Sequence, residues 1–210
     1  MRGEAPKSSL TWECRASGFS TTRLRCRWLD ERDAPFLLEL LNDPAFLDAI
    51  GDRQVRTHQQ ALDFLEYSVR DSYRTYGFGP FVIEWREGQQ GRQATAGLCG
   101  LYRRDYLTCP DVGYALLPHA RGLGVAREAA AGTLRWGTAA LGIDEVVGIT
   151  APGNGRSSRV LESCGLRLAG VVKTRLGGVL SELYTPRSSC RPTAEFVDTK
   201  HAALLRDLAP

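Results

Sequence analysis

The stretch that decides the fold runs from residue 113 to residue 129 and reads Gly-Tyr-Ala-Leu-Leu-Pro-His-Ala-Arg-Gly-Leu-Gly-Val-Ala-Arg-Glu-Ala. A short apolar run ends at Pro118, two closely spaced glycines follow an arginine, and a segment rich in helix formers comes next. This order predicts a strand, a tight loop and a helix start, where free backbone N–H groups and the positive end of the helix dipole can hold an anion. Because Gly122 and Gly124 have no side chains, a phosphate can approach the main chain closely.

The composition narrows the classes of protein that the chain can belong to. It has 210 residues, of which 43% are apolar and 24% charged, and this is ordinary for a soluble globular protein of one domain with extensions. The formal net charge of +3, from 27 basic and 24 acidic residues, indicates neither nucleic-acid nor membrane-surface binding. No apolar run approaches the roughly 20 residues that span a bilayer.

The cysteines and the N-terminal residues bear on the cellular compartment. The six cysteines are scattered without a C-x-x-C pair and the three histidines are dispersed, so we expect no metal site and no disulfide framework. Residues 1–20 are polar and lack the apolar centre of a signal peptide. We therefore expect a cytoplasmic protein with reduced thiols, and a transit peptide is the weaker alternative.

Apolar and polar side chains alternate along the chain in patterns that predict a single domain. We expect a flexible leader at 1–20, the domain at 21–186 and a tail at 187–210 that contains an amphipathic helix from 193 to 208. The expected strands span 22–28, 81–85, 94–102, 111–117 and 145–150, with a closing hairpin at 166–184, and the expected helices span 30–42, 57–73, 122–140 and 157–164.

Two nucleotide-binding folds also place a glycine-rich turn between a strand and a helix. The dinucleotide pattern G-x-G-x-x-G/A would begin at Gly122, but it requires a small residue where this chain has Arg127. The strand expected at 145–150 also ends without the acidic residue that binds a ribose hydroxyl. The P-loop is disfavoured because no Lys-Ser/Thr follows the glycines.

The pattern R-x-x-G-x-A is satisfied by residues 121–126, and a second motif follows about thirty residues downstream. Residues 154–166 read Asn-Gly-Arg-Ser-Ser-Arg-Val-Leu-Glu-Ser-Cys-Gly-Leu. Together the two segments resemble the GNAT superfamily of acyl-CoA-dependent N-acyltransferases. The second resembles the branch that acetylates N-terminal amines of ribosomal proteins (RimJ/RimL-like), in which N-x-x-S-x-x-V-L-E-x-x-G-F is typical and Leu166 here replaces the phenylalanine.

The resemblance extends from about Thr21 to Tyr184 and implies a fold of the α/β (α+β) class. We expect a single domain with a mixed, mostly antiparallel sheet of about 6–7 strands and about four helices on both faces. The sheet would be splayed at its centre, between the strands at 111–117 and 145–150.

The resemblance also implies acetyl-CoA as co-substrate and no metal. The 121–126 loop would hold the pyrophosphate, the main chain at 115–117 would pair with the pantetheine arm, and Asn154 would hydrogen-bond to that arm. Ser157 would lie near the leaving thiolate. Arg121 is equally explained as a surface arginine, and Asn154 and Ser157 as residues that cap a helix. The implied cofactor-binding residues are Ala115, Leu116, Leu117, Arg121, Gly122, Leu123, Gly124, Val125, Ala126, Asn154 and Ser157.

Acid–base residues of the family are missing at their usual positions. Many relatives carry a tyrosine seven residues after the asparagine, where this chain has Leu161, and a glutamate near the end of the preceding strand, where it has Ile149 and Thr150. The remaining catalytic candidates are Asp111, Glu182 and Ser157, with Glu84 as a further base. Absence of the usual base favours an acceptor such as an α-amine, whose pKa of about 8 leaves more of it neutral at pH 7 than a lysine.

These patterns lead to a functional hypothesis with one main rival. The chain is expected to transfer an acetyl group from acetyl-CoA to a primary amine, of a protein N-terminus or a small molecule, by direct attack on the thioester. The alternative is a catalytically weak acyl-CoA-binding or regulatory protein. The expected partners are acetyl-CoA and the amine acceptor, not nucleic acid or membrane, and the chain would act as a monomer or homodimer.

Overall fold

The computed structural model describes residues 18–86, 94–173, 180–186 and 196–197. The first of its two sheets has five strands in the order β1-β2-β3-β4-β5, and each is antiparallel to its neighbours. The alternation that predicted the second of these strands places Leu24 and Cys26 in the core. The strands are β1 (Phe19–Ser20), β2 (Leu24–Trp28), β3 (Pro80–Trp85), β4 (Thr95–Tyr102) and β5 (Asp111–Leu116).

The second sheet contains four strands in the order β6-β8-β7-β9. Across the described ranges, one isolated parallel bridge between Asp111 and Val147 joins it to the first sheet. There the Val112 N–H donates to the Val147 carbonyl at 2.8 Å, and beyond this point β5 and β6 separate. The predicted splay at the centre of the fold is confirmed. The strands are β6 (Gly148–Thr150), β7 (Leu166–Lys173), β8 (Leu180–Pro186) and β9 (Phe196–Val197).

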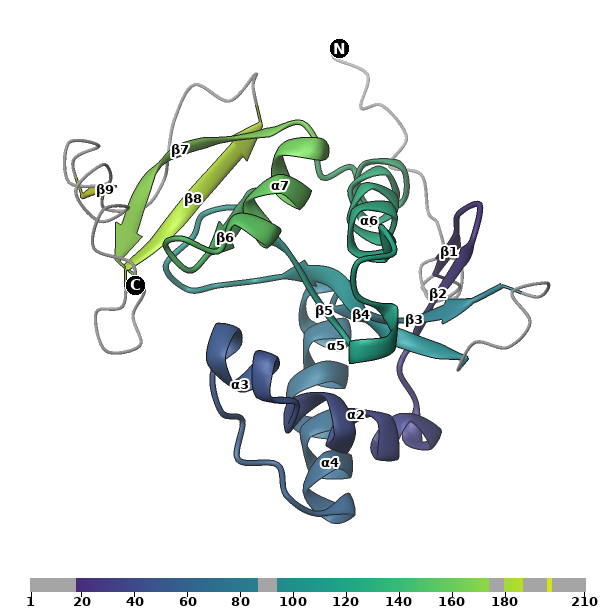
Figure 1. Cartoon of the computed structure of the whole chain (residues 1–210). Helices are drawn as coiled ribbons and strands as arrows, with labels where there is room; N and C mark the ends of the chain where they lie inside the picture. The colour runs from purple at the N-terminus through teal and green to yellow at the C-terminus, as the bar shows by residue number, and fades with distance from the viewer. Residues whose placement is uncertain (1–17, 87–93, 174–179, 187–195, 198–210) are drawn as a thin grey trace, which may run out of the picture.

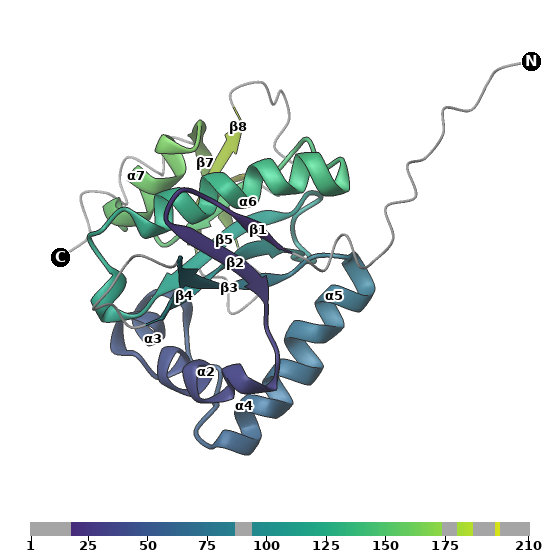
Figure 2. The ribbon, with the colours of Figure 1, turned by 90° about the vertical axis from the view of Figure 1, so that its right-hand side faces the viewer.

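Helices cover both faces, as expected (Figures 1 and 2). α6 (Val125–Leu141) and α7 (Gly155–Ser163) lie on one face, after the short η3 (Pro118–Ala120). None of the helices in the described ranges is long and apolar enough to cross a membrane. The opposite face carries η1 (Glu31–Asp33), α2 (Ala34–Leu41), α3 (Pro44–Ile50), α4 (His58–Phe64), the π-helical η2 (Leu65–Arg70) and α5 (Asp71–Tyr76).

The structure differs from the predicted elements in several places, one of which is β6, which begins at Gly148 and not at residue 145. α6 begins three residues later than expected, at Val125, because Gly122 and Gly124 adopt positive φ angles of 74° and 75°. The helix α3 was not predicted, although an Asp cap followed by Pro44 is a helix-start signal. The short strand β1 was also missed. Most of the helix predicted at 193–208 lies outside the described residues, but its residues 196–197 are wrong as helix, because they pair with β7 as a strand.

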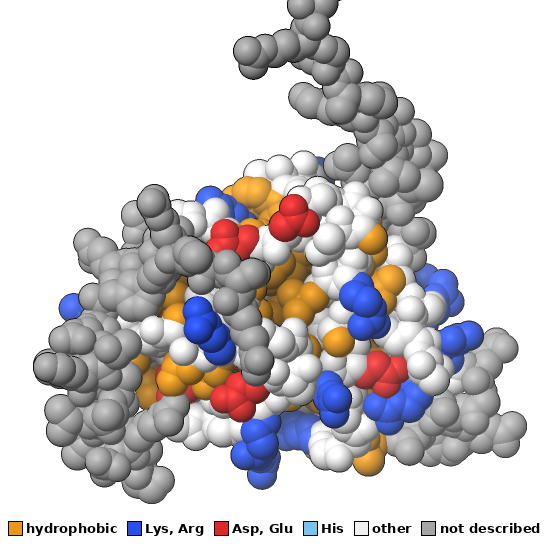
Figure 3. Space-filling model, turned by 90° about the horizontal axis from the view of Figure 1, so that it is seen from above, with side chains coloured by type: hydrophobic (Ala, Val, Ile, Leu, Met, Phe, Trp, Pro, Cys, Tyr) orange, Lys and Arg blue, Asp and Glu red, His pale blue; other side chains and the backbone are white. Residues whose placement is uncertain are grey.

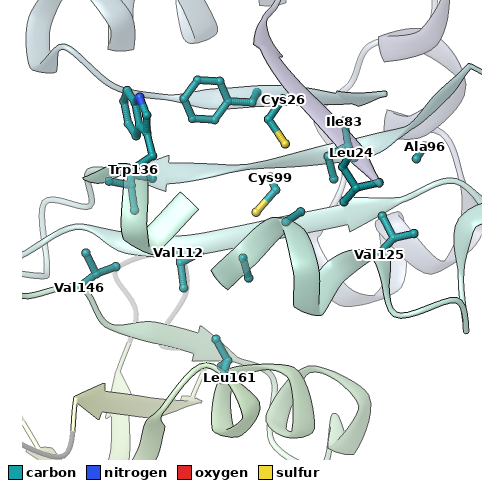
Figure 4. Packing of buried hydrophobic residues seen from close by; sticks show 14 of the residues in the cluster. Leu24, Cys26, Ile83, Ala96, Cys99, Val112, Val125, Trp136, Val146 and Leu161 are labelled. Carbon is teal, nitrogen blue, oxygen red and sulfur yellow. The ribbon is translucent and has the colours of Figure 1, made fainter. Parts of the chain in front are cut away.

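One buried cluster fills the space between the first sheet and the pair α6 and α7 (Figure 4). Cys99 of β4 and Trp136 of α6 belong to it, and so does Leu161 of α7, which is 1% exposed. Leu161 lies on Gly148 of β6, where an added Cβ would come within 2.5 Å of its Cδ2 atom. This packing fixes α7 against the second sheet, and it assigns Leu161 to the core.

A second buried cluster packs the opposite helices against the same sheet. It contains Leu37 of α2, Phe46 of α3 and Leu117 at the end of β5. On the face seen in Figure 3, acidic and basic side chains are interspersed where described atoms are visible. That part of the surface therefore offers no continuous basic patch.

Candidate active site

β5 and β6 diverge after the bridge between Asp111 and Val147. We call the region between the two diverging strands the cleft, and the backbone of β5 borders it on one side. The Leu117 N–H donates to the Ala96 carbonyl at 3.0 Å, whereas the Val112 N–H points the other way, to Val147. Because backbone groups alternate along a strand, Ala115 also faces β4, and the N–H groups of Tyr114 and Leu116 face the cleft. Within the stretch 115–117, the N–H groups of Ala115 and Leu117 thus face β4 and that of Leu116 faces the cleft, and the pairing of this stretch with a ligand stays a prediction.

The glycine-rich loop forms one mouth of the cleft. Gly124 is the N-cap of α6 and has no side chain that could accept from the first-turn N–H groups, so these donors are open to an anion. An open groove of about 370 Å³ lies beside this loop. Its lining residues are Arg23, Gly124, Arg127, Glu128, Ala131 and Arg135.

Arg23 of the β1–β2 connection holds the glycine loop from outside. Its Nη1 donates to the Leu123 carbonyl at 2.9 Å and its Nε donates to Glu128 at 2.6 Å. Burial raises the pKa of Glu128, but hydrogen bonds from the Thr21 hydroxyl and from Arg23 outweigh burial, and the pKa lies below its usual value. This ion pair, remote in sequence, ties the loop to the first sheet.

Arg121 turns back toward the protein rather than into solvent. Its Nε donates to the Leu116 carbonyl at 3.0 Å, and its Nη2 donates to the Asp43 carboxylate, which caps α3. The Leu116 carbonyl therefore has a partner within the chain, while the Leu116 N–H faces the cleft. The alternative of a merely solvated surface arginine is wrong.

The second mouth of the cleft is the start of α7. Asn154 caps this helix, and its Oδ1 accepts from the Ser157 N–H at 3.2 Å. Tyr114 reaches across from β5, and its hydroxyl donates to the Ser157 carbonyl at 3.1 Å. Burial raises the pKa of Tyr114, so this hydroxyl stays protonated. Asn154 and Ser157 thus lie together beside the cleft, and Tyr114 bridges the gap between the two sheets.

Asp111 lies at the closed end of the cleft. The residue is 1% exposed, and Arg104 donates to its carboxylate through Nε at 2.9 Å and Nη2 at 3.5 Å. Burial raises the pKa of Asp111 above the usual 3.8, against the opposing effect of Arg104. Val112 belongs to the cluster under α6, so alternation directs the Asp111 side chain to the face that carries α2 to α5.

The other carboxylates are placed differently. Glu182 of β8 is buried and faces α7, where it accepts from the Tyr184 hydroxyl at 2.9 Å and from Ser158 at 3.5 Å. Glu84 of β3 accepts from Arg27 at 2.8 Å, within the sheet and away from the cleft. The structure therefore separates Asp111 and Glu182 onto opposite faces.

Comparison with known proteins decides the family. A family model described as "Acetyltransferase (GNAT) domain" matches residues 23–167. The chain belongs to the GNAT acetyltransferase family. The match covers both mouths of the cleft and ends just after the second motif.

Solved structures similar to this GNAT chain share its fold at low sequence identity. One is the microcin C7 self immunity acetyltransferase MccE in complex with acetyl-CoA and AMP (19% identity, TM-score 0.67, covering 80% of this chain and 95% of that one). Another is RimL, a ribosomal L7/L12 alpha-N-protein acetyltransferase in complex with coenzyme A (18% identity, TM-score 0.65, covering 79% of this chain and 94% of that one). A third is the ribosomal-protein-S5-alanine acetyltransferase of Vibrio fischeri (17% identity, TM-score 0.64, covering 86% of this chain and 98% of that one).

The GNAT sequence motifs mark only residues that lie close together in the sequence, and the assignment of these residues to a ligand stays a prediction. The loop at 121–126, Asn154 and Ser157 were found because motif spacing marks them. Tyr114, Arg23 and Asp43 were missed, since they act through contacts between segments far apart in the sequence. Tyr114 had one weak signal, an aromatic residue in the strand that leads to the loop.

The ion pair of Glu128 gives a prediction for stability. Because its folded pKa is lowered, the charged form stabilises the fold above the usual glutamate pKa of 4.5, and this contribution disappears as the pH falls through the folded value. Glu128→Gln should therefore lower the free energy of unfolding by about 1–2 kcal/mol at pH 7 and by less at pH 4. Urea unfolding at both pH values measures the difference, with the exposed Glu39→Gln as control. A deficit that is equal at pH 4 and pH 7 would contradict the assignment.

Proposed function

We propose that this protein transfers an acetyl group from acetyl-CoA to a primary amine, a protein N-terminus or a small molecule, by direct attack on the thioester, and that it does so in the cytoplasm. The observation that carries the proposal is the cleft between β5 and β6. At one mouth the first-turn N–H groups of α6 are open to an anion, and at the other lies the start of α7, which Asn154 caps. Membership of the GNAT family and the folds of relatives solved with acetyl-CoA or coenzyme A support it.

The negatively charged end of acetyl-CoA matches the glycine loop. The pyrophosphate would accept from the first-turn N–H groups of α6, and the adjacent groove lined by Arg23, Arg127 and Arg135 suits the phosphorylated nucleotide. The pantetheine arm would pair with the edge of β5 like an added strand, using the N–H groups of Tyr114 and Leu116. Asn154 would contact the arm from the opposite wall.

The reaction joins the amine nitrogen to the thioester carbonyl carbon. Negative charge then develops on the carbonyl oxygen, and the cleft-facing N–H groups of Tyr114 and Leu116 are the donors available to stabilise it. The carbon–sulfur bond breaks, and the sulfur leaves as the thiolate of coenzyme A, while the nitrogen loses its proton to a base. Ser157 lies at the start of α7, where its hydroxyl can donate to the leaving sulfur.

Asp111 is the base that the geometry favours. Its carboxylate faces the side of the sheet that carries α2 to α5, opposite α6 and α7, which hold the cofactor motifs. An amine that enters from that side meets Asp111 at the closed end of the cleft. Glu182 faces α7, on the side of the cofactor motifs and away from α2 to α5, so we assign it second rank.

Activity with defined acceptors tests the proposal. Purified protein is incubated with acetyl-CoA and a panel of peptide N-termini and small amines; free thiol and the mass of the acceptor are followed. Release of coenzyme A together with an acceptor heavier by one acetyl group supports the proposal. Binding of acetyl-CoA without turnover across the panel would favour an acyl-CoA-binding or regulatory protein, a reading motivated by the burial of Leu161 where relatives carry a catalytic tyrosine.

The glycine loop yields a binding prediction with a matched control. Gly122 and Gly142 both adopt positive φ, 74° and 66°, and an added Cβ would meet nothing within 4 Å at either position. Changing either to alanine should destabilise the fold by about 1 kcal/mol through backbone strain. Only Gly122→Ala should also weaken acetyl-CoA binding, by about tenfold in calorimetry, because Gly142 lies at the far end of α6. Equal affinities of the two variants would contradict the placement of the pyrophosphate.

The raised pKa of Asp111 gives a pH prediction. A base must be ionised, so kcat/KM should fall as the pH drops through the pKa of Asp111, and this limb should lie above the 3.8 of an ordinary aspartate. Asp111→Asn should remove the limb and lower kcat/KM by roughly a hundredfold or more. Glu182→Gln is the comparison, with melting curves to verify folding. Loss of the limb in Glu182→Gln rather than Asp111→Asn would transfer the role to Glu182.

A further inference from the structure

Arg121 joins three parts of the molecule that the sequence keeps apart. It stands at the head of the glycine loop, its Nε donates to the last carbonyl of β5 at 3.0 Å, and its Nη2 pairs with Asp43 at the start of α3. Asp43 is 9% exposed, and its Oδ1 also accepts from the N–H groups of Ala45 and Phe46 at 3.0 and 3.2 Å. One guanidinium therefore connects the cofactor side of the sheet to a helix on its other side.

The contact with Leu116 has a direct consequence for the cleft. On a strand, the carbonyl and the N–H of the same residue point to the same side. Arg121 occupies the carbonyl of Leu116 and leaves its N–H exposed to the cleft, so the ligand meets a donor there and no competing acceptor. The edge of β5 therefore presents the N–H groups of Tyr114 and Leu116 as hydrogen-bond donors to the cleft.

The contact with Asp43 has a consequence on the opposite face. α3 is a short helix of seven residues, and short helices depend on their caps and on packing rather than on propensity. Phe46 of α3 packs in the same buried cluster as Ala115 and Leu117, whose backbone lies next to the cleft. The position of α3 is thus coupled to the end of β5 by packing and by the charged pair together.

We propose that Arg121 is a positioning residue that couples occupancy of the cofactor loop to the placement of α3 beside the acceptor. The inference rests on the proposed acetyl transfer. Arg121 binds the carbonyl of Leu116 and thereby fixes the end of β5, where the N–H of Leu116 faces the thioester, and it holds α3 through the carboxylate of Asp43. Binding of acetyl-CoA to the loop and binding of the amine on the other face become energetically linked through this one side chain.

The test is a double-mutant cycle. Asp43→Asn keeps an oxygen that caps α3 and removes the charge, because asparagine caps helices as well as aspartate does. Arg121→Gln removes the guanidinium, Arg121→Lys is the conservative replacement, and Arg32→Gln is the control, since Arg32 forms an exposed pair with Asp30 far from the cleft. Melting curves show which variants are folded, and the acetyl-CoA Kd and the KM and kcat for the amine are measured for each.

If Arg121 and Asp43 act through their ion pair, the effects of the two substitutions on the amine KM should not be additive. Arg121→Gln should raise the acetyl-CoA Kd and the amine KM by about tenfold each, the effect of one lost charge-assisted hydrogen bond. Asp43→Asn should raise the amine KM, with kcat within about twofold of wild type. The amine KM of the double variant should equal that of Arg121→Gln alone. Arg121→Lys should recover part of the loss. Arg32→Gln should match wild type.

Two results would overturn the proposal. If the effects of the two single changes multiply in the double variant, the residues act independently. If Arg121→Gln lowers the melting temperature but leaves both Kd and KM unchanged, the side chain is only structural. Failure of the wild-type protein to bind acetyl-CoA or release its thiol would instead refute the proposed function, so the two failures are distinguishable.

Discussion

The fold depends on the separation of β5 and β6, after which these two strands no longer pair their backbone groups with each other. Buried N–H and C=O groups need partners, and adjacent strands normally supply them to each other. Here β5 and β6 pair at Asp111 and Val147 and then diverge, so the N–H groups of Tyr114 and Leu116 face a gap rather than a neighbouring strand. Helices pack on both faces beside this gap, and the proposed pantetheine arm would use the open edge as an added strand.

Charged side chains from distant segments keep the open edge in shape. Arg23 fixes the glycine loop through Leu123 and Glu128, while Arg121 fixes the end of β5 and α3. Both arginines donate to backbone carbonyls as well as to carboxylates, which uses the fork geometry that lysine lacks. The loop that would bind phosphate is thus held by cations whose own charges are already partly neutralised.

The parts that sequence could predict are those with local causes. Periodicity marked most strands and helices, and the motifs marked the loop at 121–126 and the cap Asn154. The register of β5 decides which backbone groups face the cleft, and no local pattern reveals a register, so the sequence could not show which N–H groups of 115–117 face β4. The roles of Arg121 and Tyr114 depend on partners 78 and 43 residues away, which only the folded chain brings together.

The contact between Gly148 and Leu161 has a consequence for how relatives of this chain can diverge. A Cβ at position 148 would stand 2.5 Å from a leucine methyl, and a larger side chain at position 161 would press on the β6 backbone. The two positions therefore share a fixed volume, and a substitution at one restricts what the other can accept. A relative that carries an aromatic residue at position 161 of α7 must also increase the distance between this helix and β6. Which catalytic acids can stand at this position therefore depends on how the core is packed.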